Sequence, residues 1–341
     1  MRKIFTLAAS ALLVLSQSSF AATNTYKPEY KLSTVLGTAY PWGKAGERWV
    51  ELVRERTQGR INIKMYPGAS LVGGDQTKEF SAIRQGVIDL AIGSSINWSP
   101  QVKQLNLFSL PFFIPDSKAL DTLLTGEVGT QLFDVLGKNG VVPLAWGENG
   151  FRELSNAKLD IKSPEDLKGL KIRIVGSPIF IDYFTALGAN PTQMSWADTQ
   201  AALATNAVDG QENPLSIFSA AKLHSLGQKH LSLWDYMVDP LIFVVNKDVW
   251  LSWSPSDQDA VRAAARQAAA ENRTAARKGV TPEDNELLKA ITATGVTITS
   301  LNPEQRKAFK EVARPVVEKW SQQIGSELVK KAETVMSGKK P

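Results

Sequence analysis

Arg173 is the first residue in this sequence whose type and position suggest chemistry. It lies in the stretch LKGLKIRIVGSP (167–178), which alternates like a strand and ends in a Gly-Ser-Pro turn. A guanidinium offers a planar fork of N–H donors that matches a carboxylate. Open α/β sheets bind ligands at the carboxyl ends of their strands, where Arg173 is expected. Position alone nevertheless favours an ordinary exposed or acid-paired arginine on an edge strand over an anion-binding residue.

Asn213 is a second polar residue expected at the end of a strand. Pro214 follows it and restricts Asn213 to extended backbone, which would hold its amide in place. An amide can both donate and accept hydrogen bonds, so this position suits ligand binding. A simple turn residue is an equally good interpretation.

Three tryptophans lie in polar, irregular stretches rather than in apolar helical runs. They are Trp42 in YPWGK, Trp98 in INWSP and Trp196 in MSWAD. We expect these rings to be exposed and able to contact the body of a ligand; the alternative is that each covers the edge of a domain.

Motifs for other chemistry are absent or weak. The only histidines, His224 and His230, are six residues apart, the chain has no cysteine, and neither a glycine-rich phosphate loop nor a Gly-x-Ser-x-Gly motif occurs. Ser219 and Lys222 match Ser-x-x-Lys only as a short pattern that arises readily by chance. The sequence therefore predicts no metal, no cofactor and no enzyme activity.

The first 21 residues resemble a secretory signal peptide. A basic Met1-Arg2-Lys3 precedes the apolar run 7–15, and small residues flank Phe20 before Ala22. That run is too short to span a membrane. With no cysteine for lipid attachment, these features predict a free periplasmic protein.

The charge of the chain argues against nucleic-acid binding. The formal net charge is +5, and Lys and Arg are interleaved with Asp and Glu rather than clustered. No basic patch is therefore expected.

Strand and helix patterns alternate along the chain and predict an α/β fold. The expected strands and helices include strand 30–35, helix 42–57, strand 60–66, strand 87–94, strand 141–146, strand 240–245, a long helix from 255 to about 278, strand 295–300 and a last helix after 302. The polar segment 147–156 is expected to be irregular and to carry the chain between two lobes. The predicted division is 27–148 plus 240–278 for lobe I and 149–239 plus 279–335 for lobe II, with the long helix spanning both.

Two segments of the sequence resemble each other, as expected for two similar lobes. SAIRQGVIDLAIGS (81–94) and AALATNAVDGQENP (201–214) each read as a helix, a short step with an apolar residue and Asp, and then a strand. The alternative is that any connection from a helix to a strand looks like this.

The chain resembles the periplasmic solute-binding proteins of tripartite ATP-independent periplasmic (TRAP) transporters, the group named for C4-dicarboxylate uptake. The resemblance covers nearly the whole chain after the signal. The motifs that carry it, in order, are TQGRINIKMYPGASLVGGDQTKEFSAIRQGVIDLAIGS (57–94), LPFF (110–113), GFRELSN (150–156), SPEDLKGLKIRI (163–174), LGANPTQMSWAD (187–198) and NAVDGQENP (206–214).

The resemblance implies a type II-like binding protein whose two α/β lobes close on a ligand, joined by crossing strands and a long helix. It implies that Arg173 makes a bidentate contact with a ligand carboxylate, with Arg152, Asn213 and Trp196 beside it. Gly93-Ser94-Ser95 stands where the sialic-acid branch has an acidic residue, so a smaller organic acid is expected near Ser94. Its body could contact Trp42, Trp98 or Trp196.

The implied function is capture of a small organic acid and its delivery to the TRAP membrane permease, by a protein expected to be a monomer. The alternative is a periplasmic sensor that presents its closed form to a receptor. Both would use the same cleft, so the sequence does not separate them.

Overall fold

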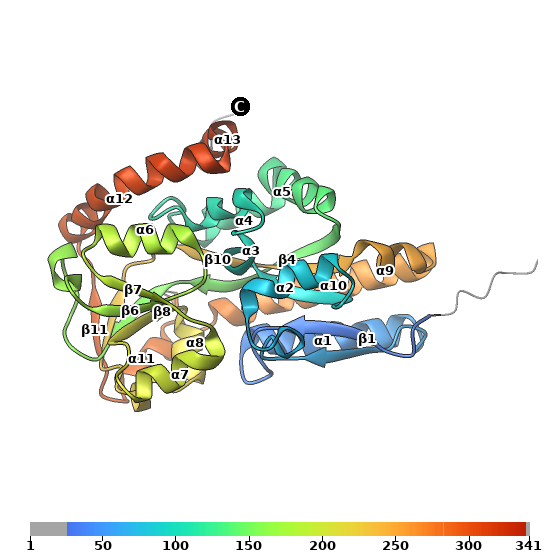
Figure 1. Cartoon of the computed structure of the whole chain (residues 1–341), viewed down its shortest axis with the longest axis horizontal. Helices are drawn as coiled ribbons and strands as arrows, with labels where there is room; N and C mark the ends of the chain where they lie inside the picture. The colour runs from blue at the N-terminus through green and yellow to red at the C-terminus, as the bar shows by residue number, and fades with distance from the viewer. Residues whose placement is uncertain (1–25, 282, 339–341) are drawn as a thin grey trace, which may run out of the picture.

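The computed structural model describes residues 26–281 and 283–338. The predicted signal peptide lies outside these residues. The described chain forms two mixed β-sheets flanked by helices, and the predicted two-lobed α/β architecture is confirmed (Figure 1).

The two sheets are built from different strands. The first sheet has the order β2 (Ile63–Tyr66), β1 (Tyr30–Thr34), β3 (Leu90–Ser94), β10 (Val238–Asn246) and β4 (Val141–Phe151). The second has the order β11 (Thr297–Ser300), β9 (His230–Leu233), β5 (Glu153–Asn156), β8 (Gly210–Asn213), β6 (Lys171–Ile174) and β7 (Asn190–Gln193).

The helices cover both sides of these sheets. The α-helices are α1 (Pro41–Arg56), α2 (Glu79–Arg84), α3 (Ser95–Trp98), α4 (Ser117–Thr125), α5 (Glu127–Lys138), α6 (Pro178–Ala186), α7 (Trp196–Ala204), α8 (Leu215–Ala220), α9 (Lys247–Ser252), α10 (Pro255–Arg277), α11 (Glu286–Thr292), α12 (Pro303–Ile324) and α13 (Ser326–Met336). Short 3-10 helices include η2 (Gln76–Lys78) and η3 (Lys103–Ser109).

The two sheets repeat one arrangement. In the first, β1 lies parallel to β2 and β3, and β3 pairs antiparallel with the crossing strand β10. In the second, β6 lies parallel to β7 and β8, and β8 pairs antiparallel with β5. The same pattern of strand pairing therefore occurs in both sheets.

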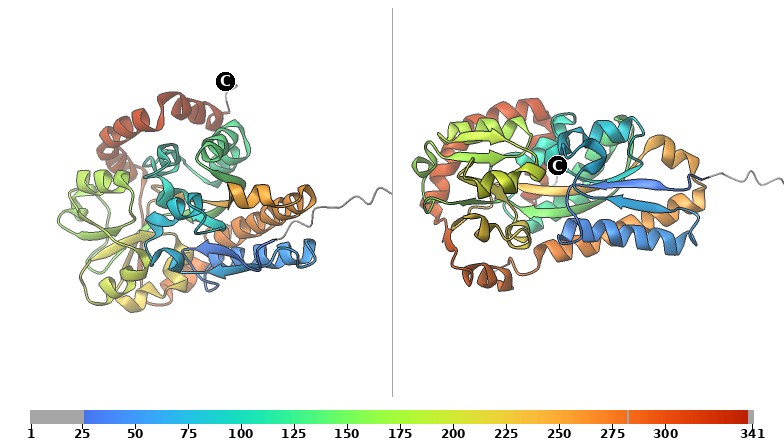
Figure 2. Two further views of the ribbon diagram at one scale, coloured as in Figure 1. Left: turned by 45° about the vertical axis from the view of Figure 1, so that its right-hand side comes forward. Right: turned by 60° about the horizontal axis from the view of Figure 1, so that its bottom comes forward.

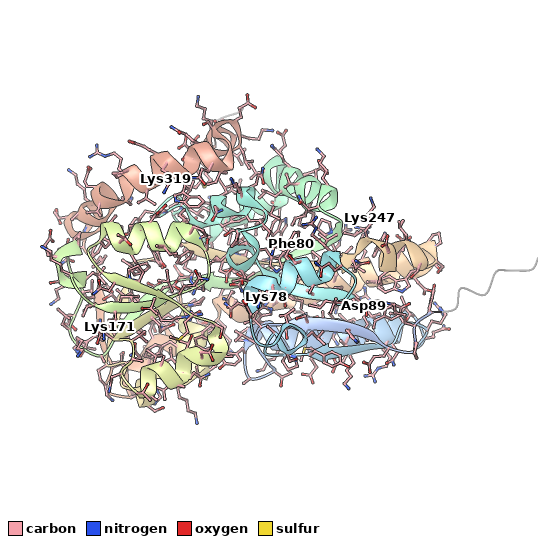
Figure 3. The ribbon with its side chains drawn as sticks, in the orientation of Figure 1. Lys78, Phe80, Asp89, Lys171, Lys247 and Lys319 are labelled. Carbon is pink, nitrogen blue, oxygen red and sulfur yellow. The ribbon has the colours of Figure 1, made fainter. Side chains whose placement is uncertain are left out.

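The two similar segments of the sequence, 81–94 and 201–214, occupy equivalent places in this repeated arrangement. Asp89 accepts a hydrogen bond from the backbone N–H of Lys31 at 2.8 Å and donates its own N–H to the Lys31 carbonyl. Asp209 makes the same two bonds with Lys171, its carboxylate oxygen lying 2.9 Å from that N–H (Figure 3 labels Asp89 and Lys171). Each aspartate thus joins the start of one strand to the start of its parallel neighbour.

Alternation along β10 divides the interior into two cores. Ile242 and Val244 pack on the side of Trp98, while Phe243 points the other way and meets Trp49 at a ring distance of 5.3 Å. Strand β10 is buried along its whole length, as its continuous apolar run predicts. Both cores extend across the two sheets, with α6, α12 and α4 on one side and α1, α7 and α11 on the other (Figures 1 and 2).

The expectation of an irregular segment at 147–156 was wrong. Strand β4 continues through this segment to Phe151, and β5 follows after Arg152. The segment is polar because its side chains have partners inside the protein: Glu148 pairs with Arg277 at 2.6 Å, and Asn149 bonds Asp239 at 2.9 Å. Polar composition therefore reflects a buried hydrogen-bond network here, not a loop.

The long helix α10 begins as predicted, with the Ser254 side chain accepting from the Asp257 N–H and Pro255 at the first turn. It packs along α1 and β4. Helix α12 begins with a capping box formed by Asn302 and Gln305, and it contacts both η3 and α6. No described helix is both long enough and apolar enough to cross a membrane.

Candidate ligand-binding site

Arg173 lies inside the second lobe, not on an edge. Its strand β6 is paired on both sides, by β7 and β8, and the residue is only 1% exposed. Nε and Nη2 donate to the carbonyl of Met194 at 3.1 and 2.8 Å, and the guanidinium lies 5.8 Å from the centre of the Trp196 ring. Across the described residues, no carboxylate lies within ion-pair distance of Arg173.

Burial makes this unpaired charge costly. Desolvation lowers the pKa of Arg173 to about 10, and the nearby charge of Arg152 adds to the lowering while Glu212 opposes it. The group is still protonated at neutral pH. A buried cation without a carboxylate partner in the protein is typical of a site that binds an anion.

Arg152, by contrast, is held by acids of the protein. Its Nε and Nη2 each donate to one oxygen of the Glu212 carboxylate, and Nη2 also donates to the side-chain oxygen of Asn213 at 3.1 Å. Nη1 lies 3.6 Å from Asp239. Burial lowers the pKa of Arg152, but Glu212 and Asp239 more than offset this, so the pKa is raised overall.

Asn213 is held at the end of β8 by its neighbours. Its Nδ2 donates to Gln211 at 2.6 Å, while its oxygen accepts from Arg152. Tyr236 donates to Glu212 at 2.9 Å, so the acid beside Asn213 has two partners. The turn interpretation of Asn213 does not hold, because the residue is the last of a buried strand.

Ser94 ends strand β3 in the first lobe and faces a buried acid. Its hydroxyl donates to Asp239 at 2.6 Å and accepts from the backbone N–H of Ile96 at the start of α3. Burial raises the pKa of Asp239, although Arg152, Ser94 and Asn149 favour its ionised form. Sequence reasoning did not single out Asp239.

The predicted tryptophans are all buried rather than exposed, because two of them line an interior cavity and one belongs to the core. Trp42 and Trp196 are 3% and 9% exposed and lie in the wall of the cavity. Trp98 does not reach it: its indole N–H donates to Glu79 at 3.1 Å and its ring packs on Phe80. The expectation that Trp98 contacts ligand is therefore corrected.

A small cavity between the lobes brings the remaining predicted residues together. Those that line it are Trp42, Ser94, Arg152, Arg173, Trp196 and Asn213. Four further polar residues that the sequence analysis missed also line it: Gln76, Asn97, Asn149 and Asp239. Of these four, only Asn149 carried a sequence signal, since it lies in the segment 147–156 where the chain was expected to cross between lobes.

The two lobes touch directly around this cavity. Gln76 accepts from the backbone N–H of Trp196 at 2.9 Å and donates to Asn97 at 3.0 Å. The hydroxyl oxygens of Ser99 and Ser177 also form a hydrogen bond between the lobes, at 2.8 Å. The cavity is thus closed by contacts between segments far apart in the sequence.

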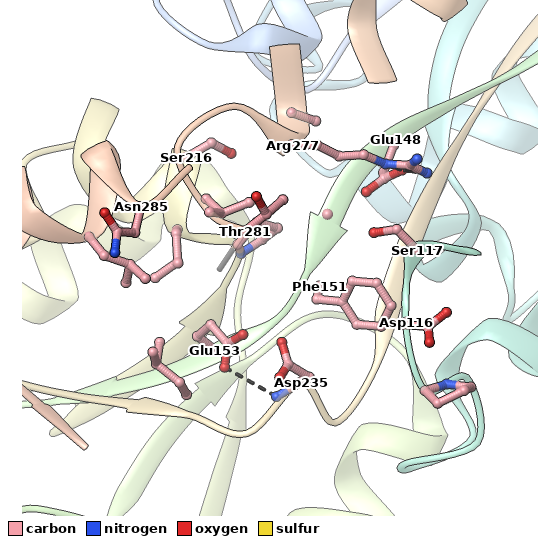
Figure 4. A pocket seen from close by; sticks show the side chains of 18 residues that line it. Asp116, Ser117, Glu148, Phe151, Glu153, Ser216, Asp235, Arg277, Thr281 and Asn285 are labelled. Carbon is pink, nitrogen blue, oxygen red and sulfur yellow. Dashed lines mark hydrogen bonds and ion pairs between the residues drawn. The ribbon is translucent and has the colours of Figure 1, made fainter. Parts of the chain in front are cut away.

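A larger cavity of about 430 Å³ lies elsewhere, between β4, β5 and the end of α10 (Figure 4). Its charged groups are mostly acids, among them Asp116, Glu153 and Asp235, and its arginine, Arg277, is already bound to Asp121 and Glu148. An anion has no unpaired cation to meet there. Nowhere in residues 26–281 and 283–338 do three or more acids or histidines converge as metal ligands would.

Comparison with known proteins agrees with this geometry. Residues 32–323 match the bacterial extracellular solute-binding protein family 7. The chain belongs to this family. It is 34% identical over 268 residues to the 2,3-diketo-L-gulonate-binding periplasmic protein YiaO of Escherichia coli, covering 78% of this chain and 79% of the relative. It is also 32% identical over 302 residues to the C4-dicarboxylate-binding periplasmic protein DctP of Rhodobacter capsulatus, covering 88% of each.

Solved structures of the family share the fold. A TRAP periplasmic solute-binding protein from Ralstonia eutropha, with (S)-2-acetolactate bound, is 60% identical with a TM-score of 0.91, covering 92% of this chain and 100% of that one. A TRAP solute-binding protein from Sulfurospirillum deleyianum with bound succinate is 29% identical with a TM-score of 0.82, covering 90% and 98%. Both of these proteins bind an organic acid.

Proposed function

We propose that this chain is a periplasmic solute-binding protein that captures a small carboxylate between its lobes and delivers it to a TRAP membrane permease. One observation carries the proposal: Arg173 is buried in the cavity wall with no carboxylate partner among the described residues. A ligand carboxylate would supply the missing charge, in a site where exclusion of water strengthens the pair.

Each residue of the cavity then has a role. Arg173 anchors the carboxylate, held in direction by its two bonds to Met194. Nη1 of Arg152 and the amide of Asn213 complete the anion contacts. Trp42 and Trp196 cover the apolar part of the ligand from the two lobes.

The ligand we favour is (S)-2-acetolactate or a close analogue. The Ralstonia eutropha protein that binds it is 60% identical to this chain, well above the identity of the family members with succinate or sugar acids bound.

Closure links binding to delivery. Lobe I (27–148 plus 240–278) would contribute Trp42 and Ser94 to the cavity, and lobe II (149–239 plus 279–335) would contribute Arg173, Trp196, Asn213 and Asp239. Because the ligand bridges the two, it favours the closed form, and that form is what the membrane permease would recognise.

Isothermal titration with (S)-2-acetolactate tests the proposal. Changing Arg173 to alanine removes one partner of a buried charge pair, a loss of about 2–5 kcal/mol, so affinity should fall by about 30-fold or more. Lys171→Ala is the matched control, because Lys171 precedes Arg173 by two residues on the same strand but is exposed. Equal affinity of the Arg173 variant and the wild-type protein would refute the assignment.

A further inference from the structure

A second charged group in the cavity, Asp239, has no evident role in holding an anion. It is 2% exposed, and it faces the same cavity as Arg173. Its Oδ1 accepts from Ser94 at 2.6 Å, its Oδ2 accepts from Asn149 at 2.9 Å, and Nη1 of Arg152 lies 3.6 Å from Oδ2. These donors fix the position of the carboxylate and favour its ionised form, against the effect of burial.

The balance of buried charge around the cavity decides how many ligand charges it can accept. Arg152 contacts two acids, Glu212 and Asp239, so this cluster carries more negative than positive charge. Arg173 is therefore the one cation in the cavity wall, over the described residues, that has no carboxylate partner within the protein. One ligand carboxylate satisfies it, and a second would meet no unpaired cation.

We propose that Asp239 makes the site selective for monocarboxylates by repelling a second carboxylate on the ligand. This inference rests on the proposed function, since it assumes that the first carboxylate binds Arg173. Like charges brought together out of water cost several kcal/mol, enough to exclude a dicarboxylate of the same size and shape.

The rest of the wall is suited to uncharged polar groups. Gln76, Asn97 and Asn149 each offer an amide, which can donate to a ligand carbonyl or accept from a ligand hydroxyl. The preferred class is accordingly a short hydroxy or oxo acid with a single carboxylate.

Three ligands of equal size test the inference on the wild-type protein. They are (S)-2-acetolactate, 2-hydroxy-2-methylmalonate and the monoamide of 2-hydroxy-2-methylmalonate. The three have the same number of non-hydrogen atoms, and the methyl of the acetyl group is replaced by a carboxylate oxygen or an amide nitrogen. By titration calorimetry, the dicarboxylate should bind about 100-fold more weakly than the monoamide. Equal affinity for these two would overturn the inference.

The variant Asp239→Asn identifies the residue responsible. It keeps the shape of the side chain and removes its charge. The gap in affinity between the dicarboxylate and the monoamide should therefore shrink to less than about tenfold. Glu148→Gln is the matched control, because Glu148 is equally buried on neighbouring β4 but faces the larger cavity. It should leave the gap unchanged; an unchanged gap in Asp239→Asn would instead overturn the assignment to Asp239.

The outcomes separate this inference from the function on which it rests. Binding of none of the three ligands by the folded wild-type protein would overturn the proposed function and the inference together. Tight binding of all three would leave Arg173 as the anchor and overturn only the selectivity assigned to Asp239. Circular dichroism verifies that each variant is folded, and the comparison of ligands on the wild-type protein does not depend on any variant.

Discussion

The two lobes share a framework but differ in the charges they bring to the cavity. In each lobe an aspartate, Asp89 or Asp209, links the start of one strand to its parallel neighbour. The ends of the corresponding strands are unlike: β3 ends in Ser94, which faces Asp239, whereas β6 carries Arg173 and β8 ends in Asn213 beside Arg152. The repeated part joins neighbouring strands within each sheet, and the part that is not repeated lines the cavity.

The largest expected effect lies in the second lobe, where Arg152 holds two buried acids. Replacing it with methionine would leave Glu212 and Asp239 buried without their cation. We expect a loss of about 3–5 kcal/mol in the free energy of unfolding, measured by urea denaturation. Arg277→Met is the control. Arg277 also forms ion pairs with two acids, but its side chain is 24% exposed, so this variant should lose less stability. Equal stability of Arg152→Met and the wild type would mean that this cluster does not hold the lobe together.

A buried acid in the first lobe, Glu79, provides the contrast because it forms no ion pair with any of the residues that the structure describes. Burial raises its pKa to about 7, although Ser33 and Trp98 donate to it and oppose the rise. The folded protein therefore binds a proton more tightly than the unfolded chain. This contribution to stability is fully present below about pH 4.5 and is lost as the pH rises through 7, a change of about 3 kcal/mol.

Glu79→Gln isolates that contribution, since glutamine keeps the shape without titrating. The variant should gain stability relative to the wild type between pH 5 and pH 8, as measured by urea unfolding at each pH. Parallel stability curves for the two proteins would show that Glu79 keeps an ordinary pKa.

The smallest expected effects come from the repeated aspartates, and they test the equivalence of the lobes. Asp89→Ala and Asp209→Ala each remove a carboxylate that accepts a backbone N–H, so each should cost about 2 kcal/mol. The two losses should add in the double variant, because the residues belong to separate sheets. A loss at one aspartate with none at the other would break the correspondence between the lobes.

Local sequence patterns predicted the framework well. Helix starts such as Ser254-Pro255 and Asn302-Pro303, and the apolar run of β10, depend on neighbouring residues and were visible without tertiary contacts. Arg173 and Asn213 were noticed as polar residues at strand ends, but position alone did not favour a ligand-binding role for either, and only the resemblance to the TRAP family implied one. Their burial, however, follows from pairing with strands elsewhere in the chain.

The rest of the site depends on contacts between distant residues. Gln76 and Asp239 reach the cavity only because the lobes meet there, and no local pattern marks that meeting. Trp98 was misjudged for the same reason: its polar neighbours predicted exposure, but Glu79 and Phe80 bury its ring. The polar composition of residues 147–156, which form the end of β4 and all of β5, predicts a loop because their partners, such as Asp239 and Arg277, lie about 90 and 130 residues away in the chain.

The central claim is that Arg173 anchors the ligand carboxylate, and a crystal structure of the protein with (S)-2-acetolactate tests it most directly. We expect the carboxylate within hydrogen-bond distance of the Arg173 guanidinium, between the rings of Trp42 and Trp196. A carboxylate bound elsewhere, for example beside Arg277 in the larger cavity, with Arg173 contacting no ligand atom, would contradict the account.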